Sequence, residues 1–175
     1  MGMGTVFVFS PDAKYGFVET GEFGINVWYV ASVSGPWKIF AVIDFDDVRD
    51  VGDVVDAVFK QTDAAGDPET ALTLVPASVR HHTYFSNTAL VRIETDVPDP
   101  GALIYHIQRV TDSEEVDSVM GNFDLLACVS DDNEEELARK IMAIRKLKGV
   151  KRTVSLRVID YRSRSDNAPG DKKLT

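Results

Sequence analysis

Two segments of the chain carry the same order of apolar, polar and glycine positions. Residues 32–47 read SVSGPWKIFAVIDFDD, and residues 118–132 read SVMGNFDLLACVSDD. Placing Gly35 on Gly121 also aligns Trp37 with Phe123. In each copy a Ser-Val-x-Gly-x-aromatic segment precedes a continuous apolar run, which is typical of two strands that meet at a tight glycine turn. The pattern therefore predicts a β-hairpin in each half of the chain.

A helical period follows each predicted hairpin. Apolar residues recur there at spacings of three and four, so each helix has one apolar stripe to lay on a sheet. In the first half these residues are Val48, Val51, Val55 and Val58, and in the second half they are Leu137, Ile141 and Ile144. In the second half Gly149 is the expected C-cap of the helix, and the alternating residues 152–160 that follow predict a strand.

The segments before each hairpin also correspond. TVFVF and ALVRIET have the composition of strands, and a Pro at a helix start follows each of them, in Ser10-Pro11 and in Asp99-Pro100. DPETALTLVP predicts a weaker strand at the end of the first half. Each half is then strand, helix, strand, strand, helix, strand, the ferredoxin-like order.

This order predicts an α+β fold of two tandem ferredoxin-like (βαββαβ) repeats. One four-stranded sheet with both helices on one face leaves its other face bare, so we expect the two sheets to cover each other as an intramolecular dimeric α+β barrel. The expected boundaries are 1–79 for the first, divergent repeat, 80–162 for the second repeat and 163–175 for a disordered polar tail.

Composition limits the possible environments and partners. The chain has 175 residues, 44% hydrophobic and 27% charged, and no run near the roughly 20 apolar residues of a membrane span. The N-terminus lacks the pattern of a secretory signal, and the single Cys128 cannot form an internal disulfide, so we expect a cytoplasmic protein. A formal charge of −9 argues against direct binding to nucleic acid.

Residues 88–160 resemble the C-terminal ligand-binding domain of Lrp/AsnC-type transcriptional regulators, also called the RAM domain. That domain typically has a Gly-x-aromatic-Asp turn before an apolar strand, a helix with an acidic start, and a Pro- or Lys-Gly-Val-x-x-Thr entry into the last strand. The matching residues here are Gly121, Phe123, Asp124, Gly149, Val150 and Thr153. In the first half Gly35 and Trp37 match, but Lys38 stands where the family has Asp.

The resemblance implies a dimeric α+β barrel that binds amino acids or similar effectors in a cleft near the turn. Most members of the family also have an N-terminal helix-turn-helix, and nothing before residue 88 reads as one. We therefore expect a non-catalytic small-molecule-binding regulator without a cofactor. Such a protein would act through homo-oligomerisation or through a helix-turn-helix paralogue.

The two glycine turns are the candidate ligand site. Backbone N–H groups of such a turn can bind an effector carboxylate, and Asp124 can bind its ammonium group. The predicted ligand-binding residues are Met120, Gly121, Asn122, Asp124, Thr153, Ser155, Ser34, Gly35 and Lys38. The alternative is that Gly35 and Gly121 serve only the backbone conformation of the turns. With Lys38 in place of Asp, at most one of two clefts would retain an amino-acid site.

Other chemistry leaves little trace in the sequence. His81 and His82 are adjacent, so in an extended segment they point to opposite sides, and no metal site is expected. Cys128 falls in a predicted buried strand, which argues against a reactive thiol. A run of aspartates lacks the spacing of a calcium loop and favours a solvated helix face. These aspartates are Asp44, Asp46, Asp47, Asp50, Asp53 and Asp56.

An enzyme is the alternative function. Dimeric α+β barrels include cofactor-free monooxygenases of the antibiotic-biosynthesis type, and Trp28, Trp37, Asn122 and His106 could line such a pocket. A closed, deep pocket lined with His and Trp would favour the enzyme. A shallow polar site beside Gly121 would favour the sensor.

Overall fold

The structure is a computed structural model that describes residues 4–11, 26–53, 68–75, 77–79 and 87–163. It divides into two compact units, and β8 (Val150–Ser163) runs from one into the other. The first unit comprises Met1–Ala77 and Ile159–Thr175, and the second comprises Ser78–Val158. Among the described residues no helix combines the length and the apolar character that a membrane span requires.

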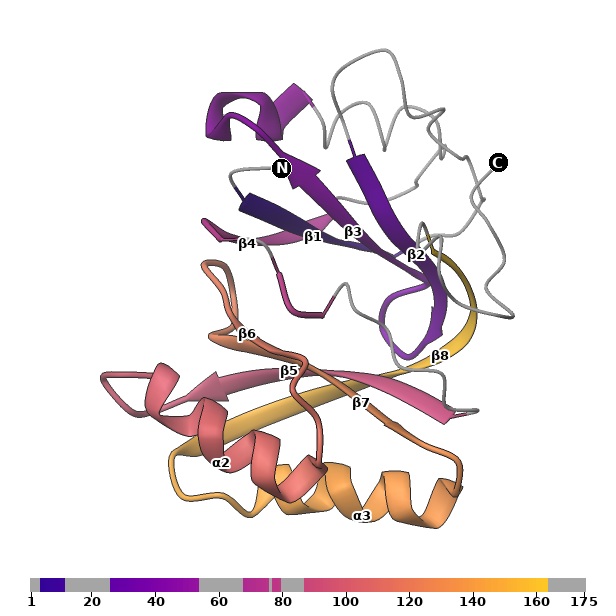
Figure 1. The fold of residues 1–175 in the computed structure, drawn as a ribbon, viewed down its shortest axis with the longest axis vertical. Coiled ribbons are helices and arrows are strands. Elements are labelled where there is room, and N and C mark those ends of the chain that lie inside the picture. Colours follow the sequence, from indigo (N-terminus) through magenta and orange to yellow (C-terminus); the bar gives the residue numbers. More distant parts are fainter. Residues whose placement is uncertain (1–3, 12–25, 54–67, 76, 80–86, 164–175) are drawn as a thin grey trace. The chain divides into compact units, whose positions relative to one another are not determined.

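The second unit has the predicted ferredoxin-like order of elements. Along the chain it contains β5 (Asn87–Thr95), α2 (Gly101–Thr111), β6 (Val116–Ser118), β7 (Leu125–Asp131), α3 (Glu134–Arg145) and the first part of β8. The strand order in the sheet is β8-β5-β7-β6, and β5 pairs antiparallel with both β7 and β8. Figure 1 shows α2 and α3 side by side on one face of these strands.

The core of the second unit lies between these helices and the sheet. Val91, Ile93, Leu125 and Ala127 are buried on the helix-facing side of β5 and β7. From α3, the predicted stripe is buried against them and consists of Leu137, Ile141 and Ile144. The amphipathic period of this helix was therefore predicted correctly. Burial of the stripe stabilises the fold by about 25 cal/mol per Å² of apolar surface removed from water.

The helix ends of the second unit follow from their capping residues. α2 begins at Gly101 and its N-cap is Pro100, so the helix starts one residue later than predicted. The Asp99 carboxylate accepts a hydrogen bond of 3.0 Å from the Gly101 amide. Asn133 caps α3 by accepting from the amides of Glu135 and Glu136. Gly149 is not the C-cap of α3, since the helix ends at Arg145 and its cap is Lys146. Gly149 instead uses its positive φ of 96° in the turn into β8.

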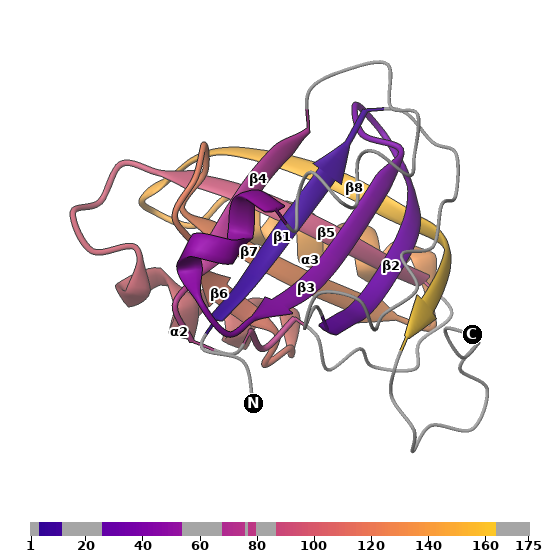
Figure 2. The same ribbon diagram turned by 90° about the horizontal axis from the view of Figure 1, so that it is seen from above.

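The described part of the first unit contains four strands with the order β4-β1-β3-β2, and β8 follows β2 (Figure 2). They are β1 (Gly4–Ser10), β2 (Asn26–Ser34), β3 (Ile39–Phe45) and β4 (Glu69–Thr73), and the 3-10 turn η1 spans Val48–Asp50. β1 pairs antiparallel with both β3 and β4. The predicted helix after Pro11, and the part of the predicted stripe at Val55 and Val58, lie outside the described residues.

The two faces of the first sheet differ in composition. One face carries aliphatic side chains such as Val6, Val8 and Ile43. The alternate positions carry aromatic rings that contact one another: Phe7 with Phe40, Phe9 with Phe40 and with Trp37, and Tyr29 with Phe40 and with Tyr161. The aspartate run is not one solvated helix face, because Asp44 lies on β3 and is buried.

Candidate functional site

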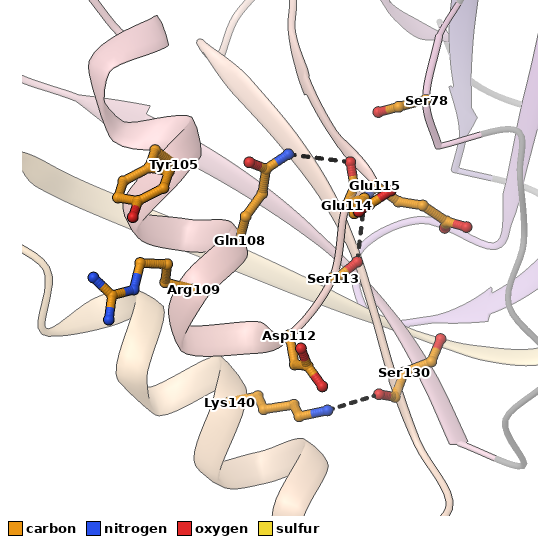
Figure 3. Close-up of a pocket in the computed structure, with 10 residues that line it drawn as sticks. All are labelled: Ser78, Tyr105, Gln108, Arg109, Asp112, Ser113, Glu114, Glu115, Ser130 and Lys140. Carbon is orange, nitrogen blue, oxygen red and sulfur yellow. Dashed lines mark hydrogen bonds between the residues drawn. The ribbon is translucent and has the colours of Figure 1, made fainter.

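A cavity of about 810 Å³ opens in the second unit. It lies beside α2, the segment from Asp112 to Glu115 that leads into β6, and parts of β7 and α3 (Figure 3). The lining residues are Ser78, Tyr105, Gln108, Arg109, Asp112, Ser113, Glu114, Glu115, Ser130 and Lys140. This is the volume of a small-molecule site, and polar and charged side chains dominate the lining.

Glu115 is held in place by backbone contacts with β7. The Cys128 amide donates to the Glu115 carbonyl at 2.9 Å, and the Ser113 hydroxyl donates to the Cys128 carbonyl at 2.8 Å. The Glu115 amide in turn donates to the Ser113 hydroxyl at 3.2 Å. Val116 packs in the core between the helices and the sheet. Because side chains alternate along an extended strand, Glu115 and Asp117 point to the opposite face of the sheet. In Figure 3 the Glu115 side chain points away from α2.

The carboxyl group of Glu115 is buried and has no hydrogen-bond partner among the described residues. The residue is 5% exposed, and neither carboxyl oxygen has a hydrogen-bond partner among the described residues. Burial raises the pKa of Glu115 to about 8, since a desolvated carboxylate loses the hydration that stabilises its charge. The Cys128 thiol opposes this shift and the Asp117 charge adds to it. A thiol is a weak donor, so it does not replace the lost water.

Cys128 lies beside this carboxyl group and stays neutral. It is buried on β7, as its apolar surroundings in the sequence predicted. Burial raises the pKa of the Cys128 thiol well above its usual value, and the neighbouring Glu115 raises it further. Because the thiolate is the nucleophilic form, this cysteine is not an activated nucleophile.

The two cations of the cavity differ in their contacts. Lys140 is largely buried, forms an ion pair of 2.9 Å with Asp131 and donates to the Ser130 carbonyl at 3.2 Å. The Asn133 amide and Lys140 together lower the pKa of Asp131. The Arg109 guanidinium lies 5.7 Å from the ring centre of Tyr105. Lys140 therefore fixes α3 to the end of β7, and the cation at the α2 side of the cavity is Arg109.

The predicted ligand-binding residues lie elsewhere in the described structure. Met120 is 52% exposed, and Gly121 and Asn122 are also exposed in the turn before β7. The Asp124 carboxylate accepts hydrogen bonds from the amide, at 2.7 Å, and from the hydroxyl of Thr95. This contact fastens the turn to the end of β5.

The remaining predicted residues divide between the two units. The Thr153 hydroxyl accepts from Arg145 at 2.9 Å, and the Ser155 hydroxyl is buried without a partner among the described residues. Ser34, Gly35 and Lys38 form the β2–β3 turn of the first unit, where Gly35 has a φ of 116°. None of the nine predicted residues lines the cavity described above. Their role as a ligand site stays a prediction.

Glu115 was not among the residues predicted from the sequence, and the residues predicted for the alternative enzyme pocket do not line the cavity. His106 is exposed on α2, and the Trp28 indole donates to Asp44 at 2.6 Å in the first unit. The signal for Glu115 in the sequence is the pair Glu114-Glu115 beside Val116, since adjacent side chains of an extended segment point to opposite sides. Among the described residues no group of His, Cys, Asp and Glu side chains is placed to hold a metal ion.

The architecture places the chain among antiparallel α+β folds with ferredoxin-like parts, and comparison with solved structures identifies a similar enzyme fold. No protein-family model and no curated protein matches the sequence. Three solved structures of chlorite dismutase from Candidatus Nitrospira defluvii are similar to the chain. Because these structures share only 9%, 12% and 10% of their residues with the chain, they show similarity of the fold alone.

The similarity extends over most of each chain. For one point mutant the TM-score is 0.56 at 9% identity, over 91% of this chain and 92% of the other. For a second point mutant the TM-score is 0.55 at 10% identity, over the same shares of both chains. For the complex with imidazole the TM-score is 0.52 at 12% identity, over 90% of each chain.

The resemblance to the Lrp/AsnC ligand-binding domain was wrong, because the similar structures are of the chlorite dismutase type. The predicted amino-acid-binding regulator of transcription is overturned with it. The physical reason is that the residues behind the resemblance serve the backbone. Gly149 makes the turn into β8 and Asp124 holds the end of β5, so the backbone of a ferredoxin-like unit accounts for both residues.

Dismutation is a redox reaction, and haem iron is one group that supplies such chemistry. Haem iron is held by His, Cys, Met or Tyr side chains. Of the lining residues in the described structure, Tyr105 alone is of these types; it is 60% exposed and its ring faces Arg109. Three acidic side chains also line the cavity. These residues do not fit a haem.

Proposed function

We propose that this chain is an enzyme of the dimeric α+β barrel class, and that Glu115 is its acid–base group in a reaction without a redox cofactor. One observation carries the proposal: the Glu115 carboxyl is buried at the cavity and has no hydrogen-bond partner among the described residues. A polar group left in this state destabilises the fold by about 1–3 kcal/mol, so a reason other than stability is needed for it.

The proton affinity of Glu115 suits acid–base catalysis near neutral pH. With a pKa of about 8, the carboxyl is mostly protonated at neutral pH and can donate its proton to a substrate atom that gains negative charge. After that transfer it is a stronger base than an ordinary carboxylate and can take up a proton from carbon or oxygen. Proton transfer at a carbon next to a carbonyl group is a reaction that such a residue performs.

The architecture of the whole chain enters the proposal as well. We propose two tandem ferredoxin-like repeats, with boundaries at 1–79 and 80–162 and a tail at 163–175, that form an intramolecular α+β barrel. Equivalent backbone bonds support the repeat: the Val33 amide donates to the Lys38 carbonyl, and the Val119 amide donates to the Asp124 carbonyl. Homo-oligomerisation and a cytoplasmic location stay predictions from the sequence, as does a helix-turn-helix partner.

The proposal is tested by proton exchange, which requires no knowledge of the full reaction. The purified protein is incubated in D₂O with a panel of small 2-oxo acids and 1,3-diketones, and loss of the α-proton signal is followed by ¹H NMR. We expect at least one compound to exchange faster with the protein than without it. Glu115→Gln keeps the shape of the side chain and removes its basicity, so it should lower that rate by roughly 100-fold or more.

Glu135→Gln is the matched control, because Glu135 is an exposed residue on α3 that does not line the cavity. Chlorite loss is measured on the same samples, since the similar structures are chlorite dismutases. Exchange that is equal in the wild type and Glu115→Gln contradicts the proposal. Decomposition of chlorite that does not depend on Glu115 would contradict it too, and would favour a redox activity.

A further inference from the structure

Asp117 fastens the chain segment that precedes β5 to the edge of the second sheet. One of its carboxyl oxygens accepts hydrogen bonds from the Ser78 amide at 2.8 Å and from the Ser78 hydroxyl at 2.9 Å. The other oxygen accepts from the Val79 amide at 2.9 Å. Asp117 is 8% exposed and Val79 is also buried. Three donors on one buried carboxylate form a strong, charge-assisted contact.

This contact lies next to the proposed acid–base group. Asp117 pairs with Leu126 of β7, and the Glu115 carbonyl accepts a hydrogen bond from the Cys128 amide of the same strand. Glu115 and Asp117 are two residues apart along this pairing, so their side chains project from the same face of the sheet. Ser78, which Asp117 holds, is itself a lining residue of the cavity. In Figure 3 the Ser78 side chain lies on the side of the strand toward which Glu115 points.

We propose that Asp117 is a positioning residue, which fixes Ser78 in the wall of the cavity, with the buried Val79 beside it, and keeps water from the Glu115 carboxyl. Its role in catalysis rests on the proposed function of Glu115, but its effects on the wall and on the Glu115 proton do not depend on any substrate. Asp117 acts on Glu115 in two ways. The wall that it holds contributes to burial, and its negative charge opposes a second negative charge two residues away.

Both effects act in the same direction on Glu115. Burial is the main cause of the raised pKa of Glu115, and the charge of Asp117 raises it further. Replacing Asp117 by a neutral residue should therefore let Glu115 ionise at lower pH. A purely structural contact between Asp117 and Ser78 would leave that titration unchanged.

The first experiment measures amide hydrogen exchange at Ser78 and Val79. In Asp117→Asn the side-chain carbonyl can still accept from Ser78, whereas the amide group faces the Val79 N–H and cannot accept from it. We expect the Val79 amide to exchange roughly 10- to 100-fold faster, the effect of losing a hydrogen bond to a charged acceptor. Asp99→Asn is the matched control, since Asp99 accepts a backbone hydrogen bond at the start of α2.

The second experiment follows the Glu115 carboxyl by ¹³C NMR as a function of pH. We expect its titration midpoint to move to lower pH in Asp117→Asn and to stay in place in Asp99→Asn. Ser78→Ala removes one of the three hydrogen bonds but leaves the Asp117 charge, so its midpoint should lie between those of the wild type and Asp117→Asn. Ser78→Ala also provides a test if Asp117→Asn does not fold.

The results separate this inference from the proposed function. A faster Val79 exchange together with a lower Glu115 midpoint supports the positioning role, whether or not any compound of the D₂O panel reacts. An unchanged midpoint in Asp117→Asn overturns it, even if Glu115→Gln abolishes proton exchange in the panel. An unchanged Val79 exchange rate overturns it as well.

Discussion

Each unit of this protein buries a carboxyl group on its sheet, and the two groups have opposite environments. Asp44 in the first unit is 3% exposed and accepts hydrogen bonds of 2.6 Å from the Thr5 hydroxyl and the Trp28 indole. Glu115 in the second unit is buried to a similar degree and accepts no hydrogen bond from the described residues. The Thr5 hydroxyl in turn accepts from the Ala77 amide at 3.1 Å, which extends the contacts of Asp44 into a network.

The difference distinguishes a structural acid from a candidate for chemistry. Donors around Asp44 replace the water that it loses, so its charge holds β1, β2 and β3 together. Around Glu115 the described residues supply no donor of comparable strength, and the proton itself stabilises the buried group. In the alignment of the proposed repeats, with Gly35 on Gly121, Tyr29 stands at the position of Glu115. The first unit therefore has a packed aromatic ring where the second has a carboxyl group.

The largest effect is expected from breaking the network of Asp44. Asp44→Ala leaves the buried Thr5 hydroxyl and the Trp28 indole without this acceptor, and each orphaned donor costs about 1–3 kcal/mol. We expect a loss of about 4 kcal/mol in the free energy of unfolding, measured by urea denaturation with Trp fluorescence. Asp46→Ala, two residues along and exposed, should change it by less than about 0.5 kcal/mol. Equal losses in both variants would contradict the structural role of Asp44.

The next effect is the dependence of stability on pH that Glu115 causes. Its pKa is about 8 in the folded chain against 4.5 for the ordinary group, so folding takes up a proton between these values. The free energy of unfolding should fall as pH rises through this range, by about 2.5 kcal/mol from about pH 5.5 to about pH 7.5.

Glu115→Gln should remove this part of the pH dependence and make the protein more stable than the wild type above about pH 8. Urea denaturation at several pH values measures the difference, and Glu135→Gln should follow the wild-type curve. A difference between wild type and Glu115→Gln that does not vary with pH would show that the pKa of Glu115 is not raised.

The smallest effect sharpens the comparison by giving Glu115 a donor of the kind that Asp44 has. Cys128→Ser replaces a weak thiol donor beside the carboxyl by a hydroxyl, which stabilises the carboxylate form. We expect the pKa of Glu115 to fall below about 8, as measured by ¹³C NMR, with a change in stability of about 1 kcal/mol or less. In Cys128→Ala, which has no donor there, the pKa of Glu115 should not fall. The same fall in both variants would argue that packing, and not hydrogen bonding, sets it.

Sequence patterns predicted the local elements of this fold because those elements depend on local periodicity. The hairpin of β2 and β3 follows from the apolar runs around Gly35, and α3 follows from the stripe at Leu137, Ile141 and Ile144. The strand β8 follows from alternation after Gly149. The prediction of a solvated helix face was wrong for Asp44, whose position depends on distant residues. Its carboxylate accepts hydrogen bonds from residues of two other strands.

The candidate site could not be predicted in this way. Glu114 and Glu115 are chemically identical neighbours, and one is exposed while the other is buried. The pairing of Glu115 with Cys128 decides which of them turns inward, and that pairing joins residues 13 positions apart. A ligand site was predicted at the glycine turns because glycine and aspartate are rare in strands. At these positions the two residue types shape the backbone.

The amino-acid sequence by itself determined the order of strands and helices in the second unit, since apolar period, caps and glycine turns act over a few residues. Only the tertiary structure decided which polar residues lose their water and which regain a partner. Burial depends on elements that are far apart in the chain, and the proton affinity of a carboxyl group depends on burial. For that reason Asp44 and Glu115 look alike in the sequence and differ in the folded protein.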